Sequence, residues 1–121
     1  MEPLDLAKKY MSAFFGDEPL DSLQELFSSE LKFSGPFYKF DKAKDYIDSL
    51  KKDPIKNASY MMVAEYQDKD SACLVYEFTK SNISTTMAQW FQVKNEKITK
   101  IKLVFDSRAF TLQGTQIIRV K

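Results

Sequence analysis

The spacing of apolar residues changes once along the chain, and the change separates a helical part from a strand part. Apolar residues recur every three or four positions over 3–15 and again over 19–29, which predicts two helices joined by a short link. Residues 30–34 are typical of a short strand. A third helix is expected after Asp41, as its cap, and ends before Pro54.

Beyond the third helix the period becomes alternating. Strands are expected at 58–67 and 72–81, and a long hairpin at 84–106 adds two more. Asn95 is the residue of the hairpin turn best suited to a positive φ. After this hairpin the pattern fades into a loop or short turn, and 115–121 is compatible with a final short strand.

These elements predict an α+β fold. Three N-terminal helices pack inside a strongly bent, mixed but mostly antiparallel sheet, and the whole forms a cone. A length of 121 residues suits one core, so we expect a single domain over 1–121.

The hairpin has one apolar face with a single polar exception, Gln89. Trp90 points to the opposite face. A buried amide needs partners, so Gln89 either meets Tyr10, Tyr76 or backbone, or lines a wet pocket. The apolar face comprises Met87, Phe91, Val93, Ile101, Leu103 and Phe105.

In the two preceding strands the pattern leaves the inward-facing set open. Tyr76 shares its parity with Leu74 and Phe78. Tyr60 shares its parity with Met62 and Tyr66, and either set can face the helices.

Composition removes several functional classes. The chain has no histidine, which excludes imidazole bases, Ser-His-Asp systems and His-ligated metals, and it has one cysteine, Cys73, in an apolar strand. Basic and acidic residues number 18 and 17, so neither sign dominates and nucleic-acid binding is not expected. We expect a cytoplasmic protein with no membrane span, no metal and no cofactor.

Four stretches of the chain carry a resemblance to a known fold family. They are Tyr10, Leu26 with Phe27, the segment from Phe33 to Pro36, and above all the segment from Ala88 to Asp106. With these features the chain resembles nuclear transport factor 2-like domains of the SnoaL-like and ketosteroid-isomerase-like kind over residues 4 to about 114. The resemblance implies the cone-shaped fold. It implies no single function, because this fold hosts enzymes and binding modules.

The comparison with ketosteroid isomerases can be made residue by residue. The resemblance puts the oxyanion tyrosine of that family at Tyr10 and its protonated aspartate at Gln89, whose amide can still donate a hydrogen bond. The catalytic base falls on Gly35, which has no side chain to accept a proton. Relatives that use an Asp-His pair are excluded by the absence of histidine. The Asp-Arg-Asp cluster of epoxide hydrolases has no counterpart, since Arg108 and Arg119 follow the last core strand.

The sequence and the resemblance leave three functions open. The first is an enzyme acting on a small, apolar, carbonyl-bearing molecule, with Tyr10 and Gln89 polarising the carbonyl and Asp106 as a candidate base. The second is a module that binds such molecules without catalysis. The third is a dimeric association module whose cavity is filled by its own aromatic side chains. The expected pocket mouth lies between the first helix, the turn at 35–40 and the open end of the sheet. Gln89 is expected at the floor of the pocket, with Tyr10 beside it and Gly35 in the turn at its mouth. The expected apolar wall comprises Phe14, Phe37, Tyr38, Tyr76, Leu103 and Phe105.

The outward parity of the hairpin also predicts an assembly. It places Trp90 beside Ala88 and Thr86 on an exposed sheet, and a large aromatic residue there is typical of an interface. We therefore expect a homodimer through the convex face of the sheet.

Overall fold

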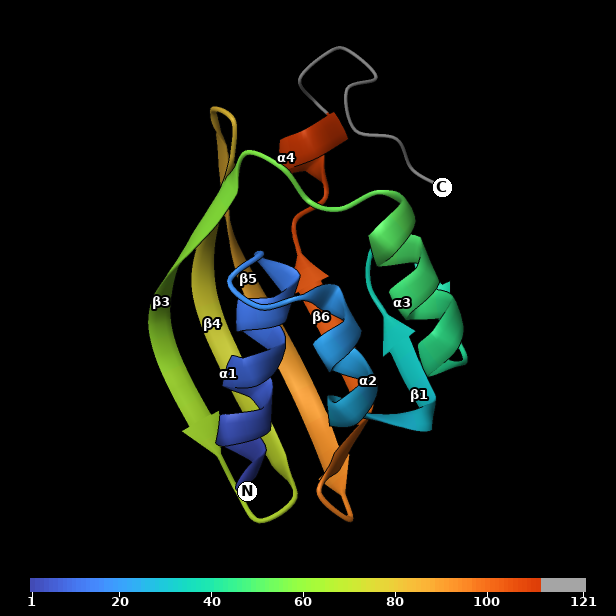
Figure 1. Cartoon of the computed structure of the whole chain (residues 1–121). Coiled ribbons are helices and arrows are strands. Elements are labelled where there is room, and N and C mark those ends of the chain that lie inside the picture. The colour runs from blue at the N-terminus through green and yellow to red at the C-terminus, as the bar shows by residue number, and fades with distance from the viewer. Residues whose placement is uncertain (112–121) are drawn as a thin grey trace.

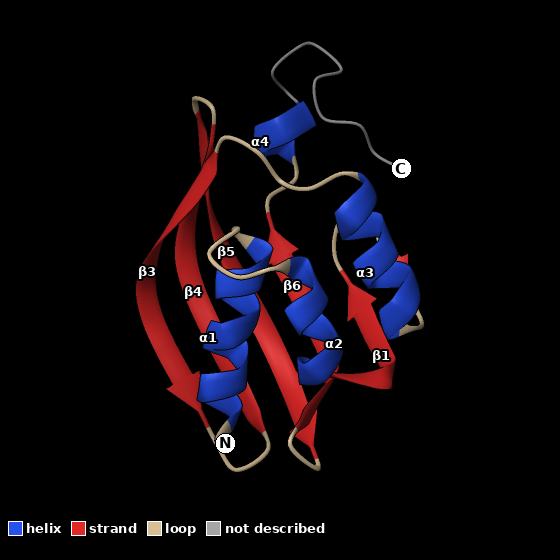
Figure 2. Cartoon of the chain, in the orientation of Figure 1, coloured by secondary structure: helices blue, strands red, loops and turns tan. Residues whose placement is uncertain are grey.

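The computed structural model describes residues 1–111, which form one sheet that curls around three helices (Figure 1). The strand order is β2-β1-β6-β5-β4-β3, with β1 and β6 parallel and every other neighbouring pair antiparallel. The helices lie against one face of this sheet (Figure 2). The predicted α+β cone is therefore confirmed. The elements are α1 (Pro3–Phe14), η1 (Leu20–Ser22), α2 (Leu23–Leu26), β1 (Phe27–Ser34), β2 (Lys39–Phe40), α3 (Ala43–Lys52), β3 (Ala58–Gln67), β4 (Ser71–Lys80), β5 (Ile83–Lys94), β6 (Lys97–Phe105) and α4 (Arg108–Thr111).

The first helix begins and ends as its sequence predicts. Pro3 occupies the first turn, where its missing N–H costs nothing, and the Asp5 carboxylate accepts a hydrogen bond from the backbone N–H of Glu2 at 3.1 Å. Gly16 follows the helix with a φ of +93°, a conformation that side chains other than glycine rarely adopt. The tight turn at Gly16 brings α2 back alongside α1.

The second helix is shorter than predicted, and the first strand is longer. The chain passes from a 3₁₀ turn into four residues of α-helix ending at Leu26, and β1 begins at Phe27. Phe27 pairs with Ile98 of β6, and both side chains are buried. Tertiary pairing with the neighbouring strand therefore overrides the helical spacing at 27–29.

The third helix begins one residue later than predicted. Lys42, not Asp41, precedes its first turn, and no side chain caps the helix there. The helix ends at Lys52, before Pro54, as expected. Its inward side chains include Tyr46 and Ile47, which are 3% and 4% exposed.

Two bulges change which side chains face inward, which a strict alternation does not foresee. On β3 the register shifts between Met62 and Ala64, so Tyr66 turns to the outer face and is 63% exposed. On β6 a shift beside Thr99 brings Ile98 inward, fully buried. The inward parity of Tyr60 and Met62 therefore does not extend to Tyr66.

The remaining predictions for the hairpins are confirmed, with one addition. Asn95 has a φ of +53°, as predicted, and Glu96 follows with +61°. The segment after Asp106 contains a short helix, α4, and the strand predicted at 115–121 lies outside the described residues. Among the described residues, no helix combines the length and the apolar character needed to cross a bilayer.

Candidate functional site

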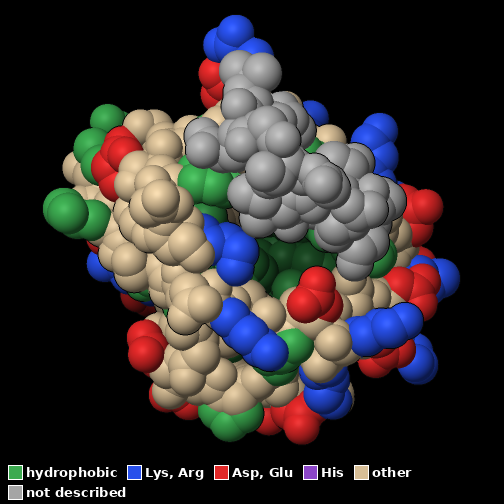
Figure 3. Space-filling model, turned by 90° about the horizontal axis from the view of Figure 1, so that it is seen from above, with side chains coloured by type: hydrophobic (Ala, Val, Ile, Leu, Met, Phe, Trp, Pro, Cys, Tyr) green, Lys and Arg blue, Asp and Glu red, His purple; other side chains and the backbone are tan. Residues whose placement is uncertain are grey.

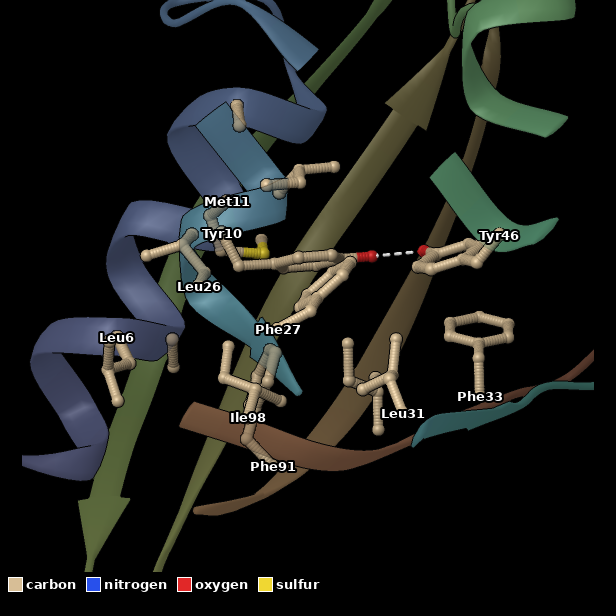
Figure 4. Close-up of a cluster of buried hydrophobic side chains, with 14 of the residues drawn as sticks. Leu6, Tyr10, Met11, Leu26, Phe27, Leu31, Phe33, Tyr46, Phe91 and Ile98 are labelled. Atoms are coloured by element: carbon tan, nitrogen blue, oxygen red, sulfur yellow. Dashed lines mark hydrogen bonds between the residues drawn. The ribbon is translucent and has the colours of Figure 1, made fainter. Parts of the chain in front are cut away.

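Four polar side chains meet inside the cone, each delivered by a different element. Tyr10 comes from α1, Tyr46 from α3, Tyr76 from β4 and Gln89 from β5, and all are at most 3% exposed. The hydroxyl oxygens of Tyr10 and Tyr46 are 2.5 Å apart (Figure 4). The Tyr76 hydroxyl donates to the Gln89 side-chain oxygen at 2.7 Å. We call these four residues the polar cluster.

Strand register explains how the polar cluster forms. On the inner face Gln89 lies opposite Leu74, and Tyr76 is two residues further along β4, so the phenol reaches the amide diagonally. The Gln89 side chain also hydrogen-bonds the Tyr10 hydroxyl, and since its oxygen accepts from Tyr76, we assign its amide nitrogen as the donor. Gln89 thus joins α1 to the sheet.

The polar cluster has more hydrogen-bond donors than it uses. Its three hydroxyls carry one proton each and the amide of Gln89 carries two, which makes five, and the bonds described above use three of them. Every buried side-chain oxygen and nitrogen among the described residues has a partner. These bonds leave two protons, one on the amide and one on the Tyr10–Tyr46 pair, without an assigned acceptor. The polar cluster can therefore donate to one further acceptor atom.

The tyrosines of the polar cluster are neutral and act as donors, not as bases. Burial raises the pKa of Tyr10 to about 12, although hydrogen bonds from Tyr46 and Gln89 partly oppose the rise. Burial, together with the neighbouring Tyr10, raises the pKa of Tyr46 and of Tyr76 well above the usual value. Neither a phenolate base nor a nucleophile is therefore present near neutral pH.

The position of the family base is tight even for a Cβ atom. A Cβ atom on Gly35 would lie 3.3 Å from the ring of Phe33 and 3.6 Å from Cβ of Leu103. The backbone N–H of Gly35 donates to the carbonyl of Tyr38 at 2.9 Å, which closes the turn. Among the described residues no charged side chain is buried, so no carboxylate lies inside the cone.

Asp106, the candidate base suggested by the sequence, lies on the surface. Its side chain is 52% exposed and pairs with the guanidinium of Arg108 at 2.7 Å. Hydrogen bonds from the side chain and backbone of Arg108 lower the pKa of Asp106 to about 2. A carboxylate this acidic and this exposed is poorly suited to abstract a proton from a molecule inside the cone.

The open end of the cone is lined by aromatic rings, several of them from the predicted wall. Phe37 meets Phe105 with ring centroids 5.6 Å apart, and Phe110 of α4 contacts both. Viewed onto this end, Figure 3 shows hydrophobic side chains at the bottom of a hollow whose rim carries charged side chains. The expected mouth is thus apolar.

The other predicted wall residues fall into two groups. Phe14 stacks on Tyr10, and Leu103 lies opposite Gln89 in the sheet, so both border the polar cluster. Tyr38 instead stacks on Phe40, with centroids 6.2 Å apart, beside the turn.

Two residues of this region were not among the site residues predicted from the sequence, Tyr46 and Phe110. The inward position of Tyr46 is readable from the helical pattern, but its bond to Tyr10 depends on how α1 and α3 pack. Phe110 follows the last regular pattern, and nothing in the local sequence indicates that it turns back onto the sheet.

Two surface hollows lie at the opposite, closed end of the cone. Their volumes are about 570 and 470 Å³, and both border the turn between β5 and β6. Neither is lined by a member of the polar cluster. The first is lined by Met1, Pro3, Lys69, Asp70, Gln92, Val93, Lys94, Asn95 and Glu96, and the second by Phe27, Ser28, Ser29, Lys94, Asn95, Lys97 and Thr99.

Comparison with known proteins identifies the fold but no family by sequence. No protein-family model and no curated protein matches the chain. Many solved structures share its fold. An NTF2-like protein of unknown function from Cytophaga hutchinsonii has a TM-score of 0.74 at 18% identity, over 86% of this chain and 89% of that one.

Two further structures with this fold carry functional descriptions. A candidate ketosteroid isomerase from Kribbella flavida gives a TM-score of 0.76 at 14% identity, covering 86% of this chain and 77% of its own. A candidate SnoaL-like polyketide cyclase from Shewanella putrefaciens gives 0.74 at 15% identity, covering 89% and 82%. The chain thus has the NTF2-like fold of the predicted superfamily, and at these identities the likeness describes the fold alone.

Proposed function

We propose that this domain binds a small, largely apolar molecule through a carbonyl or similar acceptor atom and does not catalyse proton transfer. The observation that carries the proposal is the polar cluster, which holds two unused donor protons in an otherwise apolar interior. A buried donor without a partner costs about 1 to 3 kcal/mol, so an acceptor placed there gains correspondingly. Gln89 and the Tyr10–Tyr46 pair would each donate a hydrogen bond to this acceptor.

The lack of a base separates this proposal from an isomerase. Removing a proton beside a carbonyl needs an acceptor within hydrogen-bond reach, which contributes roughly 10² to 10⁴ in rate. The described interior holds no carboxylate, Gly35 stands at the family base position, and Asp106 points into solvent. The fold neighbours described as an isomerase and a cyclase support a small-molecule site, while these residues favour binding without turnover.

The proposal is tested with prodan, an aromatic ketone whose fluorescence shifts when it leaves water. Titration of the intact protein should give a saturable blue shift, and alicyclic ketones should compete. Gln89→Leu and Tyr10→Phe should each weaken binding by roughly 1 to 3 kcal/mol, because each removes a donor. Tyr66→Phe, which changes an exposed tyrosine on the outer face, is the matched control and should bind as the wild type does. Equal affinities in all four proteins would refute the site.

We also propose that the domain is a homodimer through the outer face of the sheet. Four of its large apolar side chains are more than half exposed, and Trp90 and Val75 lie between them in the strand register. The face therefore has an apolar centre, as a stable interface requires. The four exposed residues are Met61 at 69%, Val63 at 60%, Tyr66 at 63% and Val104 at 57%.

The charges around this apolar centre favour a second copy as its partner. Lys100 and Lys102 lie toward one end of the face, beside Gln92 and Trp90, and Glu77 lies toward the other end, opposite Thr86. A copy docked with its strands reversed would bring each acidic end over a basic end. The face is thus self-complementary in charge as well as apolar.

Sedimentation velocity at tens of micromolar tests the dimer. The wild type should sediment as a dimer, and Val104→Lys should sediment as a monomer because it buries a charge at the centre of the interface. Gln24→Lys adds the same charge on the exposed side of α2 and should leave the dimer intact. A wild-type protein that is monomeric throughout this range would rule out the assembly.

A further inference from the structure

The short helix α4 places one large side chain in the open end of the cone. Phe110 is 3% exposed, and its ring centroid lies 5.4 Å from that of Phe105, 6.1 Å from that of Phe78 and 6.3 Å from that of Phe37. In Figure 1, α4 stands above the open end, on the side opposite the N-terminus. A four-residue helix has little stability of its own, so contacts of this ring hold it in place.

The sheet register places Phe110 on the route from the open end to the polar cluster. Gln89 lies opposite Leu103 on the inner face. One step toward the open end, Met87 lies opposite both Tyr76 and Phe105. A further step brings Phe78, and the ring of Phe110 rests on both Phe78 and Phe105. A molecule entering from this end would meet Phe110 before it met Gln89.

The Asp106 carboxylate and three backbone N–H groups form local hydrogen bonds at the start of α4. The Asp106 carboxylate accepts from the backbone N–H of Arg108 at 3.0 Å and pairs with its guanidinium. The backbone N–H of Ala109 donates to the carbonyl of Asp106, and that of Phe110 donates to the carbonyl of Ser107. Movement of α4 as a unit would keep all of these bonds and would break the ring contacts.

We propose that Phe110 is the gate of the interior site and determines which molecules enter it. This inference rests on the proposed ligand site, and α4 and the ligand compete for the open end of the cone. In the closed form Phe110 completes the aromatic wall. The site becomes accessible when α4 lifts, and the volume left by the ring sets the size of ligand that fits. Burial of a phenylalanine ring shifts the equilibrium between the open and closed positions of α4 by roughly 10- to 100-fold toward the closed form.

A labelling experiment tests the gate without any ligand. Met87→Cys puts a thiol beneath Phe110 on the inner face, while the native Cys73 on the outer face serves as the control in the same molecule. Labelling with N-ethylmaleimide is followed at each site by mass spectrometry. Adding Phe110→Ala should speed labelling at position 87 by about tenfold or more and leave Cys73 unchanged. Equal rates at position 87 with and without Phe110→Ala would overturn the gate, and equal acceleration at both sites would assign the effect to general loosening and overturn it too.

Prodan titration then tests the link between the gate and the ligand. Phe110→Ala should bind prodan roughly 10- to 100-fold more tightly than the wild type. Arg108→Ala leaves every wall residue in place and loosens α4 alone, so it should tighten binding by a smaller factor. It also replaces Phe110→Ala in both experiments if that variant does not fold. Unchanged or weaker prodan binding in both variants would overturn Phe110 as the gate of that site. If no variant binds prodan but position 87 still labels faster, the gate stands and the proposed function fails.

Discussion

The two faces of the sheet carry alternate side chains of the same strands, yet they differ in how those side chains are covered and hydrogen-bonded. On the inner face Leu74 and Phe91 are fully buried under the helices, and the one amide, Gln89, is hydrogen-bonded on both sides. On the outer face Val63 and Val104 are 60% and 57% exposed, with nothing in the described chain covering them.

The difference shows what each face of the sheet lacks among the described residues. The helices cover the apolar side chains of the inner face. The polar cluster has more donor protons than assigned acceptors, so the inner face lacks an acceptor. The outer face lacks apolar cover. These two deficits are of different kinds, and they underlie the two proposals: a small acceptor molecule inside and a second copy outside.

Truncating one apolar residue on each face should give the largest contrast in stability. Leu74→Ala removes a fully buried side chain beneath α1 and leaves a cavity, so the free energy of unfolding should fall by about 2 to 5 kcal/mol. Val63→Ala removes a side chain that is mostly in water, and under monomeric conditions it should change that energy by less than about 0.5 kcal/mol. Urea denaturation of both variants measures the contrast, and similar losses would mean that the two faces are equally covered.

Features of the fold that depend on neighbouring residues could be predicted from the sequence, and features that depend on tertiary pairing could not. The long hairpin, its turn at Asn95 and the inward set around Phe91 follow from alternation and turn chemistry, and the structure confirms them. The predicted end of the second helix was wrong, and so was the prediction that Tyr66 shares a face with Tyr60 and Met62. The first is decided by the pairing of Phe27 with β6, and the second by a bulge, and neither leaves a mark in the local sequence.

The residues of the candidate site also differ in whether local sequence information identifies them. Gln89 and Tyr10 stand out in the sequence because one is polar on an apolar strand and the other matches a family position, and the structure brings them together. Tyr46 and Phe110 could not be assigned. Their contacts depend on how α3 lies across the sheet and on how the chain turns back after Asp106, and both are properties of the packed whole.

Replacing the inner amide should cost more than an ordinary polar-to-apolar change in a core. In the structure the Tyr76 hydroxyl donates to this amide. The Gln89→Leu variant leaves that phenol without an acceptor, so the free energy of unfolding should fall by about 1 to 3 kcal/mol. Adding Tyr76→Phe removes the stranded hydroxyl and should restore most of the loss. Additive losses in the double variant would contradict the bond.

Alkaline pH should destabilise the inner face specifically. An unfolded tyrosine ionises near pH 10, whereas burial raises the pKa of Tyr10 in the folded protein to about 12. Stability is therefore complete below about pH 9 and falls as the pH rises from about 10 to 12, by roughly 1 kcal/mol per buried tyrosine near pH 11. Urea denaturation across this range should show a smaller loss for Tyr46→Phe than for the wild type. Under monomeric conditions Tyr66→Phe, on the outer face, should show the wild-type loss, and a reduced loss there would contradict the assignment.

The smallest effect on folding, and the most informative for the outer face, is expected from substituting two of its exposed valines together. Val63→Ser with Val104→Ser should change the unfolding energy of the monomer by less than about 1 kcal/mol in total, because both side chains are already largely in water. A dimer makes the melting temperature rise with protein concentration, since association adds to the stability of the folded state. The wild type should therefore show this rise over a hundredfold range of concentration, and the double variant should not. The same dependence in both proteins would mean that any association uses another surface.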